Sequence, residues 1–184
     1  MPDPLDVRRI ASAELTPAEL ARLRDLFAAC WPAGEFTVDD VDHALGGVHW
    51  VAEAGGRIVG HASVVARFLE ADGLPMRSGY VEAVATLPAW RGRGIATRLL
   101  QAAGEHIRAA FEFGALSTDV HGMYERLGWE RWCGPTFVRT VETAVRTEDE
   151  DDGIMFLCTP RTPPLTLTEG LTCEWRVGDL VRKA

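Results

Sequence analysis

Arginines and glycines alternate in the segment Trp90-Arg91-Gly92-Arg93-Gly94-Ile95-Ala96, which follows an apolar run ending at Leu87. This order predicts a strand, a turn and the start of a helix, where backbone N–H groups lack partners inside the helix. The helix dipole adds positive charge there, and glycine lets an anion approach the backbone closely. We therefore expect Arg91–Ala96, here called the phosphate turn, to hold a pyrophosphate. The alternative is an ordinary exposed Arg/Gly turn before a surface helix.

The spacing within the phosphate turn narrows the range of ligands that it could bind. The sequence contains neither the Gly-Lys-Ser/Thr of a Walker loop nor a G-x-G-x-x-G dinucleotide motif. Instead, Arg91-x-x-Gly94-x-Ala96 resembles the acyl-CoA signature of the GCN5-related N-acetyltransferases, Gln/Arg-x-x-Gly-x-Gly/Ala. The resemblance implies an acetyl-CoA co-substrate and an acetyl transfer to an amine.

Acetyl transfer from a thioester requires an amine that loses a proton, a polarised carbonyl and a protonated leaving thiolate. Glu82 stands in the apolar strand before the phosphate turn, where a raised pKa would suit a general base. Glu82 could instead point outward from a half-exposed strand. On the same strand, the backbone N–H of Val84 could polarise the carbonyl if the sheet splays locally.

Tyr124 is the candidate acid, because a phenol can give a proton to a thiolate as that thiolate forms. It stands in His121-Gly-Met-Tyr-Glu-Arg-Leu-Gly-Trp129, and acetyltransferases place their acid at this distance from the phosphate-binding helix. Packing of Tyr124 in a short helix before the Gly-Trp turn is the alternative.

Further motifs narrow the resemblance to the aminoglycoside 2′-N-acetyltransferases. They extend from the first loop to the tail: Gly34-Glu-Phe-Thr37, His43-Ala-Leu-Gly-Gly47, Gly79-Tyr-Val-Glu82, Gly114-Ala-Leu-Ser117, Gly134-Pro-Thr136, Asp151-Asp-Gly153 and Cys173-Glu-Trp-Arg-Val-Gly-Asp179. The resemblance implies direct acetylation of the 2′-amine of a cationic aminoglycoside, which would confer resistance. It also implies a homodimer.

The same resemblance implies roles for individual residues. Glu82 would be a base acting through water, and Tyr124 the acid. Contacts to pantetheine and pyrophosphate would come from Val84, Ala85, Thr86, Arg91, Gly92, Arg93, Gly94, Ile95 and Ala96. Contacts to the ammonium and hydroxyl groups of the antibiotic would come from Glu35, Asp40, Ser117, Asp151, Asp152 and Asp179. Such carboxylate–ammonium hydrogen bonds are of the strong, charge-assisted kind.

The sequence departs from the family pattern in three places. Leu180–Ala184 extends the chain beyond the Gly-Asp motif, where family members end on an aromatic residue whose carboxylate lies in the site. Ala83 stands where a glycine is expected beside the base, and the loop between Ser117 and Tyr124 is slightly shorter. We expect these changes to affect substrate preference and the reach of Tyr124.

The elements that must position these residues follow from periodicity and turn signals. Thr16-Pro17-Ala18-Glu19 is a capping box that starts a helix reaching about Ala29, and Thr37 starts a shorter one ended by Gly46-Gly47. A helix from Ile95 should end at Gly114. Further ranges predict a short helix at 123–127 and strands at 5–10, 48–54, 57–68, 77–87, 115–117, 137–141 and 154–158.

This order predicts one α/β (α+β) domain over residues 1–184, a mixed and mostly antiparallel sheet flanked by helices, with the GCN5-related acetyltransferase fold. We expect residues 159–184 to form a tail that contributes to the substrate site. Four scattered cysteines without a Cys-x-x-Cys pair are expected to be buried, reduced thiols, and the histidines show no metal-ligand spacing, so we expect no metal.

The net charge of −8 disfavours nucleic acid as a partner, because affinity there comes from basic groups on phosphates. No apolar stretch has the length of a membrane span, and the N-terminus lacks a signal peptide's pattern, so we expect a cytoplasmic protein. The acidic loop, Glu148–Asp152, suits a cationic substrate but is also typical of a solvated loop.

Two other functions stay open. The enzyme could acetylate a different amine, such as a kasugamycin-like aminosugar, a polyamine or a peptide. Alternatively, the chain could be a non-catalytic acyl-CoA-binding or drug-binding module, although Glu82 and Tyr124 are both present.

Overall fold

The structure is a computed structural model that describes residues 5–71, 73–177 and 179. The extension Leu180–Ala184, expected to alter substrate preference, lies outside the described residues. The chain forms two compact units, of residues 1–65 with 81–103 (unit 1) and residues 66–80 with 104–184 (unit 2). The strands β3 (Arg57–Ala71) and β4 (Leu74–Thr86) and the helix α3 (Ile95–Ala110) contribute to both.

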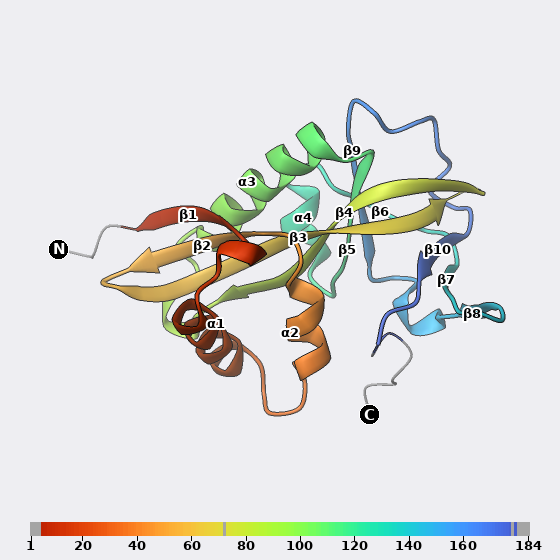
Figure 1. The fold of residues 1–184 in the computed structure, drawn as a ribbon. Helices are drawn as coiled ribbons and strands as arrows, with labels where there is room; N and C mark the ends of the chain where they lie inside the picture. The colour runs from red at the N-terminus through yellow and green to blue at the C-terminus, as the bar shows by residue number, and fades with distance from the viewer. Residues whose placement is uncertain (1–4, 72, 178, 180–184) are drawn as a thin grey trace. The chain divides into compact units, whose positions relative to one another are not determined.

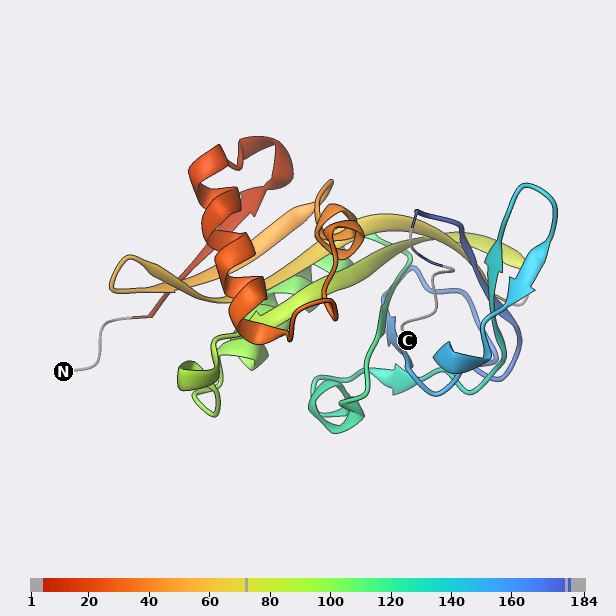
Figure 2. The same cartoon turned by 90° about the horizontal axis from the view of Figure 1, so that it is seen from below.

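Unit 1 is a sheet with helices on both faces. The helices α1 and α2 lie over one face and the start of α3 over the other (Figures 1 and 2). Antiparallel ladders join β1 to β2 and β2 to β3. The elements are β1 (Asp6–Ala11), η1 (Ser12–Glu14), α1 (Pro17–Cys30), α2 (Val38–Ala44), β2 (Val48–Ala54) and η2 (Pro88–Trp90), with the unit-1 parts of β3, β4 and α3.

Local sequence signals explain the element boundaries of unit 1. At α1, Thr16 Oγ1 accepts from the Glu19 backbone N–H while the Glu19 carboxylate accepts from the Thr16 N–H, as the capping box predicts. Gly55 and Gly56 have φ of +55° and +74°, as a type I′ turn between β2 and β3 requires. At Gly60, an added Cβ would lie 2.6 Å from Ile95 Cγ2, so glycine allows α3 to pack closely on β3.

Unit 2 is built around a mixed sheet. Its strand order is β6-β9-β5-β4-β3-β10-β7-β8. The β4–β5 and β10–β7 pairs are parallel, whereas the β10–β3, β5–β9, β6–β9 and β7–β8 pairs are antiparallel. The elements are β5 (Phe113–Ser117), α4 (His121–Glu125), β6 (Glu130–Arg131), β7 (Thr136–Arg139), β8 (Ala144–Arg146), η3 (Glu148–Glu150), β9 (Ile154–Cys158) and β10 (Leu171–Glu174).

The structure confirms the predicted α/β class with a mixed, mostly antiparallel sheet, and it corrects one helix boundary. The helix α3 ends at Ala110, not at Gly114, because the chain is already extended at Phe113. The Phe113 ring stacks on Phe156 at 4.8 Å between centroids, which places this residue in the sheet. Gly114 lies inside β5, where a Cβ would come within 3.0 Å of Leu157 Cβ.

Other sequence expectations also change. The tail expected from residue 159 contains a strand, β10, which pairs with β3 and β7. The short strands β6 and β8 are not predicted from the sequence, because two or three residues are too few to show an alternating pattern. The four cysteines are free, but none is fully buried as expected: Cys30 and Cys173 are half-buried, and Cys133 and Cys158 are exposed. Cys158 occupies the outward-facing end of β9, whose preceding four residues are all buried.

Candidate functional site

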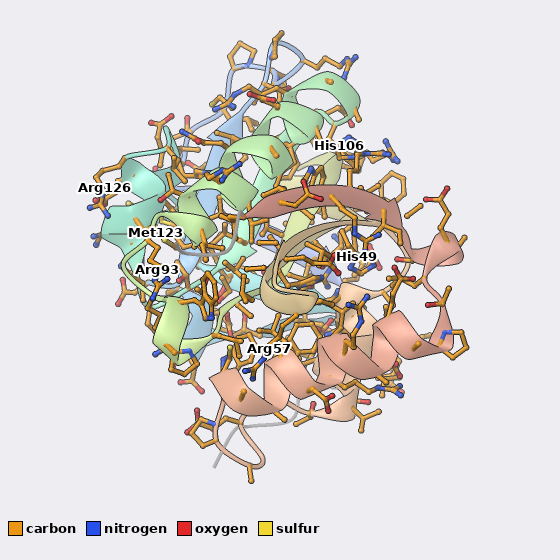
Figure 3. All side chains as sticks on the ribbon, turned by 90° about the vertical axis from the view of Figure 1, so that its left-hand side faces the viewer. His49, Arg57, Arg93, His106, Met123 and Arg126 are labelled. Atoms are coloured by element: carbon orange, nitrogen blue, oxygen red, sulfur yellow. The ribbon has the colours of Figure 1, made fainter. Side chains whose placement is uncertain are left out.

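The phosphate turn has the open backbone that an anion requires. Gly92 and Gly94 have φ of +74° and +73°, a conformation that favours glycine, and no heavy atom lies within 4 Å of a Cβ added at either position. Figure 3 shows Arg93 at the turn that precedes α3. Its guanidinium lies 4.6 Å from the Trp90 ring centroid, and it donates to the Ala89 carbonyl at 3.3 Å. The turn therefore combines free space, cationic side chains and a helix N-terminus.

The end of β4 supports the same ligand. Thr86 Oγ1 is buried and has no hydrogen-bond partner in the described part of the chain. Buried hydroxyls of this kind are normally satisfied, so this one fits a site that a bound molecule completes. The Thr86 carbonyl accepts from Arg91 Nε at 3.3 Å, which ties the strand end to the phosphate turn. These residues fit an acyl-CoA.

Cys30, at the end of α1, is a residue near this turn that the sequence reasoning missed. Burial raises the pKa of its thiol, partly offset by the nearby Arg91 charge and by a hydrogen bond with the Thr86 backbone. A lone cysteine at the end of a helix gives no sequence signal for a position beside this turn, because the contact is made only in the tertiary structure.

The candidate base stands next to a kink in β4. Ala83 has φ of +50°, within the left-handed region that side chains other than glycine rarely adopt. Two side chains of β3 bind the carbonyls at this kink: Ser63 Oγ donates to Glu82 O at 3.2 Å, and the His61 ring binds Ala83 O at 2.7 Å. Consecutive carbonyls of a regular strand point to opposite edges, so β4 is locally irregular at Glu82 and Ala83.

The kink also sets the direction of one backbone donor. In a trans peptide, the N–H points opposite to the C=O of the same plane, and the described chain has no cis peptides. Because Ala83 O is bound by β3, the Val84 N–H points away from β3. The Glu82 side chain is half-buried, and the strand continues through Val84 and Thr86 to the phosphate turn. Unit 1 thus brings together the candidate base, a directed N–H and the phosphate turn.

The two substrate-binding candidates of unit 1 differ in their surroundings. The Asp40 carboxylate closes a capping box at α2, accepting from Thr37 N at 2.7 Å and Thr37 Oγ1 at 2.9 Å. Glu35 is exposed in the loop between α1 and α2. Beside that loop, the Trp31 and Phe36 rings stack at 4.3 Å between centroids. Asp40 therefore has a structural role, whereas Glu35 is exposed to solvent in a loop that also carries two stacked aromatic rings.

The candidate acid, Tyr124, is buried within unit 2. Burial raises the pKa of Tyr124 to about 12, although a hydrogen bond with Thr118 acts in the opposite direction. Its ring packs edge-on against Trp129 at 6.0 Å between centroids. The Tyr124 ring therefore packs as the alternative interpretation predicts, in a short helix before the Gly-Trp turn. Its hydroxyl stays protonated at neutral pH.

The acidic loop of unit 2 is organised by internal contacts. Ser117 Oγ donates to Glu150 Oε2 at 2.6 Å, and the His121 ring lies 2.6 Å from the Asp152 carbonyl. Asp152 itself is exposed. Glu150 is a candidate that sequence reasoning missed, because its pairing with Ser117 joins residues far apart in the chain.

Asp151 holds this loop to β7 and β8. Its carboxylate accepts from Thr136 N at 2.9 Å and from Arg146 Nη1 at 2.6 Å. These contacts, with the Arg146 hydrogen bond as the largest, lower the pKa of Asp151 to about 2. The carboxylate is therefore ionised and already engaged at neutral pH.

Asp179 is also engaged by cations. Its Oδ2 lies 3.1 Å from Arg67 Nη2, and it accepts from the Arg176 backbone N–H at 2.7 Å. The side chains of Arg67 and Asp179 are both largely buried, at 7% and 11% exposure. Arg67 also lies over the Tyr80 ring. The predicted acids therefore divide into Glu35 and Asp152, which are exposed, and Asp40, Asp151 and Asp179, which hold structure together.

Comparison with known proteins identifies related sequences. Residues 46–131 match the family model described as an acetyltransferase (GNAT) domain. The chain is 40% identical over 151 residues to the aminoglycoside 2′-N-acetyltransferase of Mycolicibacterium fortuitum, a match covering 80% of this chain and 77% of that protein.

Solved structures share the fold at lower identity. A GNAT family acetyltransferase from Brucella melitensis, in complex with acetyl-CoA, is 20% identical with a TM-score of 0.61, over 89% of this chain and 93% of that chain. A GNAT family N-acetyltransferase from Escherichia coli, in complex with CoA, is 13% identical with a TM-score of 0.60, over 94% and 89%. A third, from Kribbella flavida, has a TM-score of 0.58 at 20% identity over 72% of this chain, which spans only 34% of that one.

Proposed function

This chain belongs to the GNAT acetyltransferases, and from that premise we propose that it transfers acetyl from acetyl-CoA directly to the 2′-amine of an aminoglycoside. The observation that carries the chemistry is the kink at Ala83, which lies between the Glu82 carboxylate and the outward Val84 N–H. The substrate class is supported by the 40% identical relative and by the acidic side chains. In a cell exposed to the drug, the transfer would confer resistance, because it removes a positive charge from the antibiotic.

In this proposal, each step of the reaction is carried out by a specific group of the protein. Backbone N–H groups of the phosphate turn bind the pyrophosphate, and Arg91 and Arg93 add charge. The Val84 N–H donates to the thioester carbonyl oxygen, on which negative charge develops. Glu82 takes a proton from the 2′-ammonium through water, and the freed nitrogen pair forms the N–C bond. The C–S bond then breaks, and Tyr124 gives its proton to the departing sulfur. The second proton of the attacking nitrogen leaves to water as the amide forms, and Tyr124 is reprotonated from water.

The residues proposed to bind the substrate differ in the contacts that they already make within the protein. We propose that Glu35, Ser117 and Asp152 meet the ammonium and hydroxyl groups directly, since they are exposed. Asp40 and Asp179 would contact the drug while keeping their present partners, because a carboxylate has about four acceptor sites and these contacts use fewer. Asp151 would contact the drug in exchange for one of its hydrogen bonds with Thr136 and Arg146, which already use that number. Glu150 joins the set through its hydrogen bond to Ser117.

The organisation of the chain is part of the proposal. We propose that residues 1–184 work as one catalytic domain, and that the tail from residue 159 contributes to the substrate side. Pairing of β10 with β3 and β7 supports this, since it makes the tail part of the unit-2 sheet. A cytoplasmic homodimer completes the proposal. No helix in the described ranges has the length and apolarity to cross a membrane.

The first test measures thiol release from acetyl-CoA with a panel of amines: aminoglycosides with a 2′-amine, analogues with a 2′-hydroxyl, kasugamycin, spermidine and a lysine peptide. Turnover confined to the 2′-amine compounds is the expected result. Turnover on kasugamycin or another amine alone would support acetyl transfer but would contradict the proposed substrate. Binding of acetyl-CoA without turnover on any compound would instead favour the binding-module alternative.

The base is tested by Glu82→Gln, which keeps the size of the side chain and removes its ability to accept a proton. We expect kcat to fall by about 100-fold or more, as for the loss of a general base, with little change in the KM for acetyl-CoA. Glu53→Gln on β2 is the matched control, because Glu53 also lies on a strand of unit 1 and pairs with Arg8 and Arg22 instead. Equal rates for the two variants would remove Glu82 from the mechanism.

A further inference from the structure

A chain of hydrogen bonds crosses the interior of unit 1 and ends at the kink in β4. Ser12 Oγ lies 2.7 Å from His49 Nε2, His49 Nδ1 lies 2.9 Å from His61 Nε2, and His61 Nδ1 lies 2.7 Å from Ala83 O. Ser12, His49 and His61 are here called the imidazole chain. They come from η1, β2 and β3, so the imidazole chain links three separate elements to one carbonyl.

The last acceptor gives the chain a direction. A carbonyl can only accept, so His61 Nδ1 must carry the proton that is donated to Ala83 O. In a neutral ring, His61 Nε2 is then an acceptor, and His49 Nδ1–H must be its donor. His49 Nε2 in turn accepts from the Ser12 hydroxyl. Ser12 Oγ is itself held by the backbone N–H groups of Gly46 and Gly47, at 2.8 and 3.0 Å.

The surroundings of the imidazole chain keep water out. His61 is fully buried and His49 is 1% exposed. The Phe27 and His61 rings pack edge-to-face at 5.1 Å between centroids. Burial lowers the pKa of both rings, to about 4 for His49 and about 3 for His61, so both are neutral at physiological pH. In such a setting, hydrogen bonds are strong and polarise one another.

The bound carbonyl belongs to a residue in an unfavourable conformation. Ala83 has φ of +50°, in the left-handed region, where its Cβ comes close to the following carbonyl oxygen and the conformation is unfavourable. A buried donor on the Ala83 carbonyl opposes relaxation, because rotating the peptide plane would leave the His61 N–H without its acceptor. Rotation of that plane would also turn the Val84 N–H and move the adjoining Glu82.

From this geometry we propose that the imidazole chain is a positioning device for acetyl transfer, with His61 as its acting end. It holds the Ala83 peptide plane so that the Val84 N–H is presented to the thioester oxygen and Glu82 keeps its orientation. Ser12, His49 and His61 touch no reacting atom and act through the peptide plane. The proposal rests on the roles proposed above for Glu82 and Val84.

The kinetic test compares two substitutions at one position. His61→Leu removes the donor, whereas His61→Asn keeps an N–H at the same number of bonds from the backbone as Nδ1. We expect His61→Leu to lower kcat by about tenfold, the value of one buried hydrogen bond, with the KM for acetyl-CoA nearly unchanged. His61→Asn should recover most of that loss.

Val59→Ala is the control, because Val59 is fully buried in β3, two residues before His61, and is not part of the imidazole chain. It should lower the melting temperature as His61→Leu does while leaving kcat close to that of the native enzyme. If kcat fell equally in both variants, or if Asn rescued nothing at equal stability, His61 would be merely structural and the proposal overturned.

A spectroscopic measurement separates this proposal from the proposed function. Nitrogen-15 spectra of the imidazole rings should show His49 and His61 as neutral, both with the proton on Nδ1, and His61→Leu should shift the Val84 amide resonance more than Val59→Ala does. A His61 ring protonated on Nε2 alone would overturn the proposal. These readouts need no amine substrate, so they test it even if no panel compound is acetylated.

Discussion

Buried histidines make the folded chain sensitive to acid, and the sign follows from their pKa values. His49 and His61 have pKa values lowered to about 4 and about 3, mainly by desolvation, against 6.5 for the free side chain. Between pH 6.5 and 4 the unfolded chain therefore binds more protons than the folded one. Stability rises with pH wherever this holds, so it is lost as the pH falls through this window.

We expect the free energy of unfolding to fall by about 2 kcal/mol for each of the two histidines between pH 8 and pH 5, because the unfolded state takes up the protons. Denaturant titrations at the two pH values measure this difference. In His61→Asn one of the two contributions is removed, so the difference should be about half as large. A native protein equally stable at pH 5 and pH 8 would contradict the burial of neutral rings.

Tyr124 is compatible with both of its interpretations, packing in a short helix and acting as the acid. Its ring packs against Trp129, while burial raises its pKa to about 12, so it is protonated throughout the physiological range. A group that must donate a proton to a thiolate is useful in that state.

For Tyr124→Phe we expect kcat to fall by about 100-fold, in the range of general acid catalysis, while the pH profile of the native enzyme shows no loss from tyrosine ionisation below about pH 11. Rates with acetyl-CoA between pH 6 and 10 provide the measurement. Tyr80→Phe is the control, because Tyr80 is the other tyrosine of the chain. A full rate in Tyr124→Phe would assign the proton to water.

Among the elements, β3 and β4 contribute most of the contacts that position the proposed base and the Val84 N–H. β3 supplies His61 and Ser63, whose side chains bind the carbonyls of Ala83 and Glu82. β4 continues through Thr86 toward the phosphate turn and α3. Close packing of α3 on β3 depends on Gly60, where a side chain would meet Ile95 and Leu99. The site of unit 1 is therefore built on long regular elements, with the irregularities confined to Ala83 and the turn.

Gly94→Ala tests the phosphate turn. We expect it to raise the KM for acetyl-CoA by about tenfold or more, because a methyl group would obstruct charge-assisted contacts to the backbone, and to destabilise the fold by about 1 kcal/mol through its positive φ. Gly104→Ala in α3 is the control: its φ is not positive, and a Cβ would meet only the tip of Arg108 at 3.3 Å and Leu157 at 3.7 Å. An unchanged KM in Gly94→Ala would exclude close approach of phosphate there.

On the scale of the whole molecule, the charge distribution suits two substrates of opposite sign. The net charge is −8, yet the phosphate turn carries Arg91 and Arg93 exposed. The acidic loop carries its carboxylates on the surface, apart from the half-buried Asp151. Among the described side chains, His, Cys, Asp and Glu form no group of three or more that could hold a metal ion.

Salt should therefore weaken binding of the cationic substrate. Raising ionic strength from about 50 to about 500 mM shortens the Debye length several-fold, so we expect the KM for the aminoglycoside to rise. In Glu35→Gln the rise should be smaller, because one of the exposed attractive charges is gone. Measuring KM against salt in both proteins checks this, and identical salt dependences would place the drug away from Glu35.

The sequence alone determined features that are local or strongly patterned. Thr16 with Glu19, the Gly55-Gly56 turn and the apolar stripe from Ile95 each depend on neighbouring residues, so the elements were predictable. The phosphate turn and the family were predictable because their spacing is specific. The roles of Glu82 and Tyr124 stay predictions, while their surroundings now explain how they could work.

Contacts between residues far apart in the chain could not be predicted from the sequence and are known from the fold. No pattern links Ser12, His49 and His61 to Ala83, or Ser117 to Glu150, because each pair meets only when strands and loops are assembled. The same applies to Asp151 and Asp179, which composition presents as free acids and the fold pairs with Arg146 and Arg67. A sequence lists which charges exist, whereas folding decides which are already neutralised and which remain for a substrate.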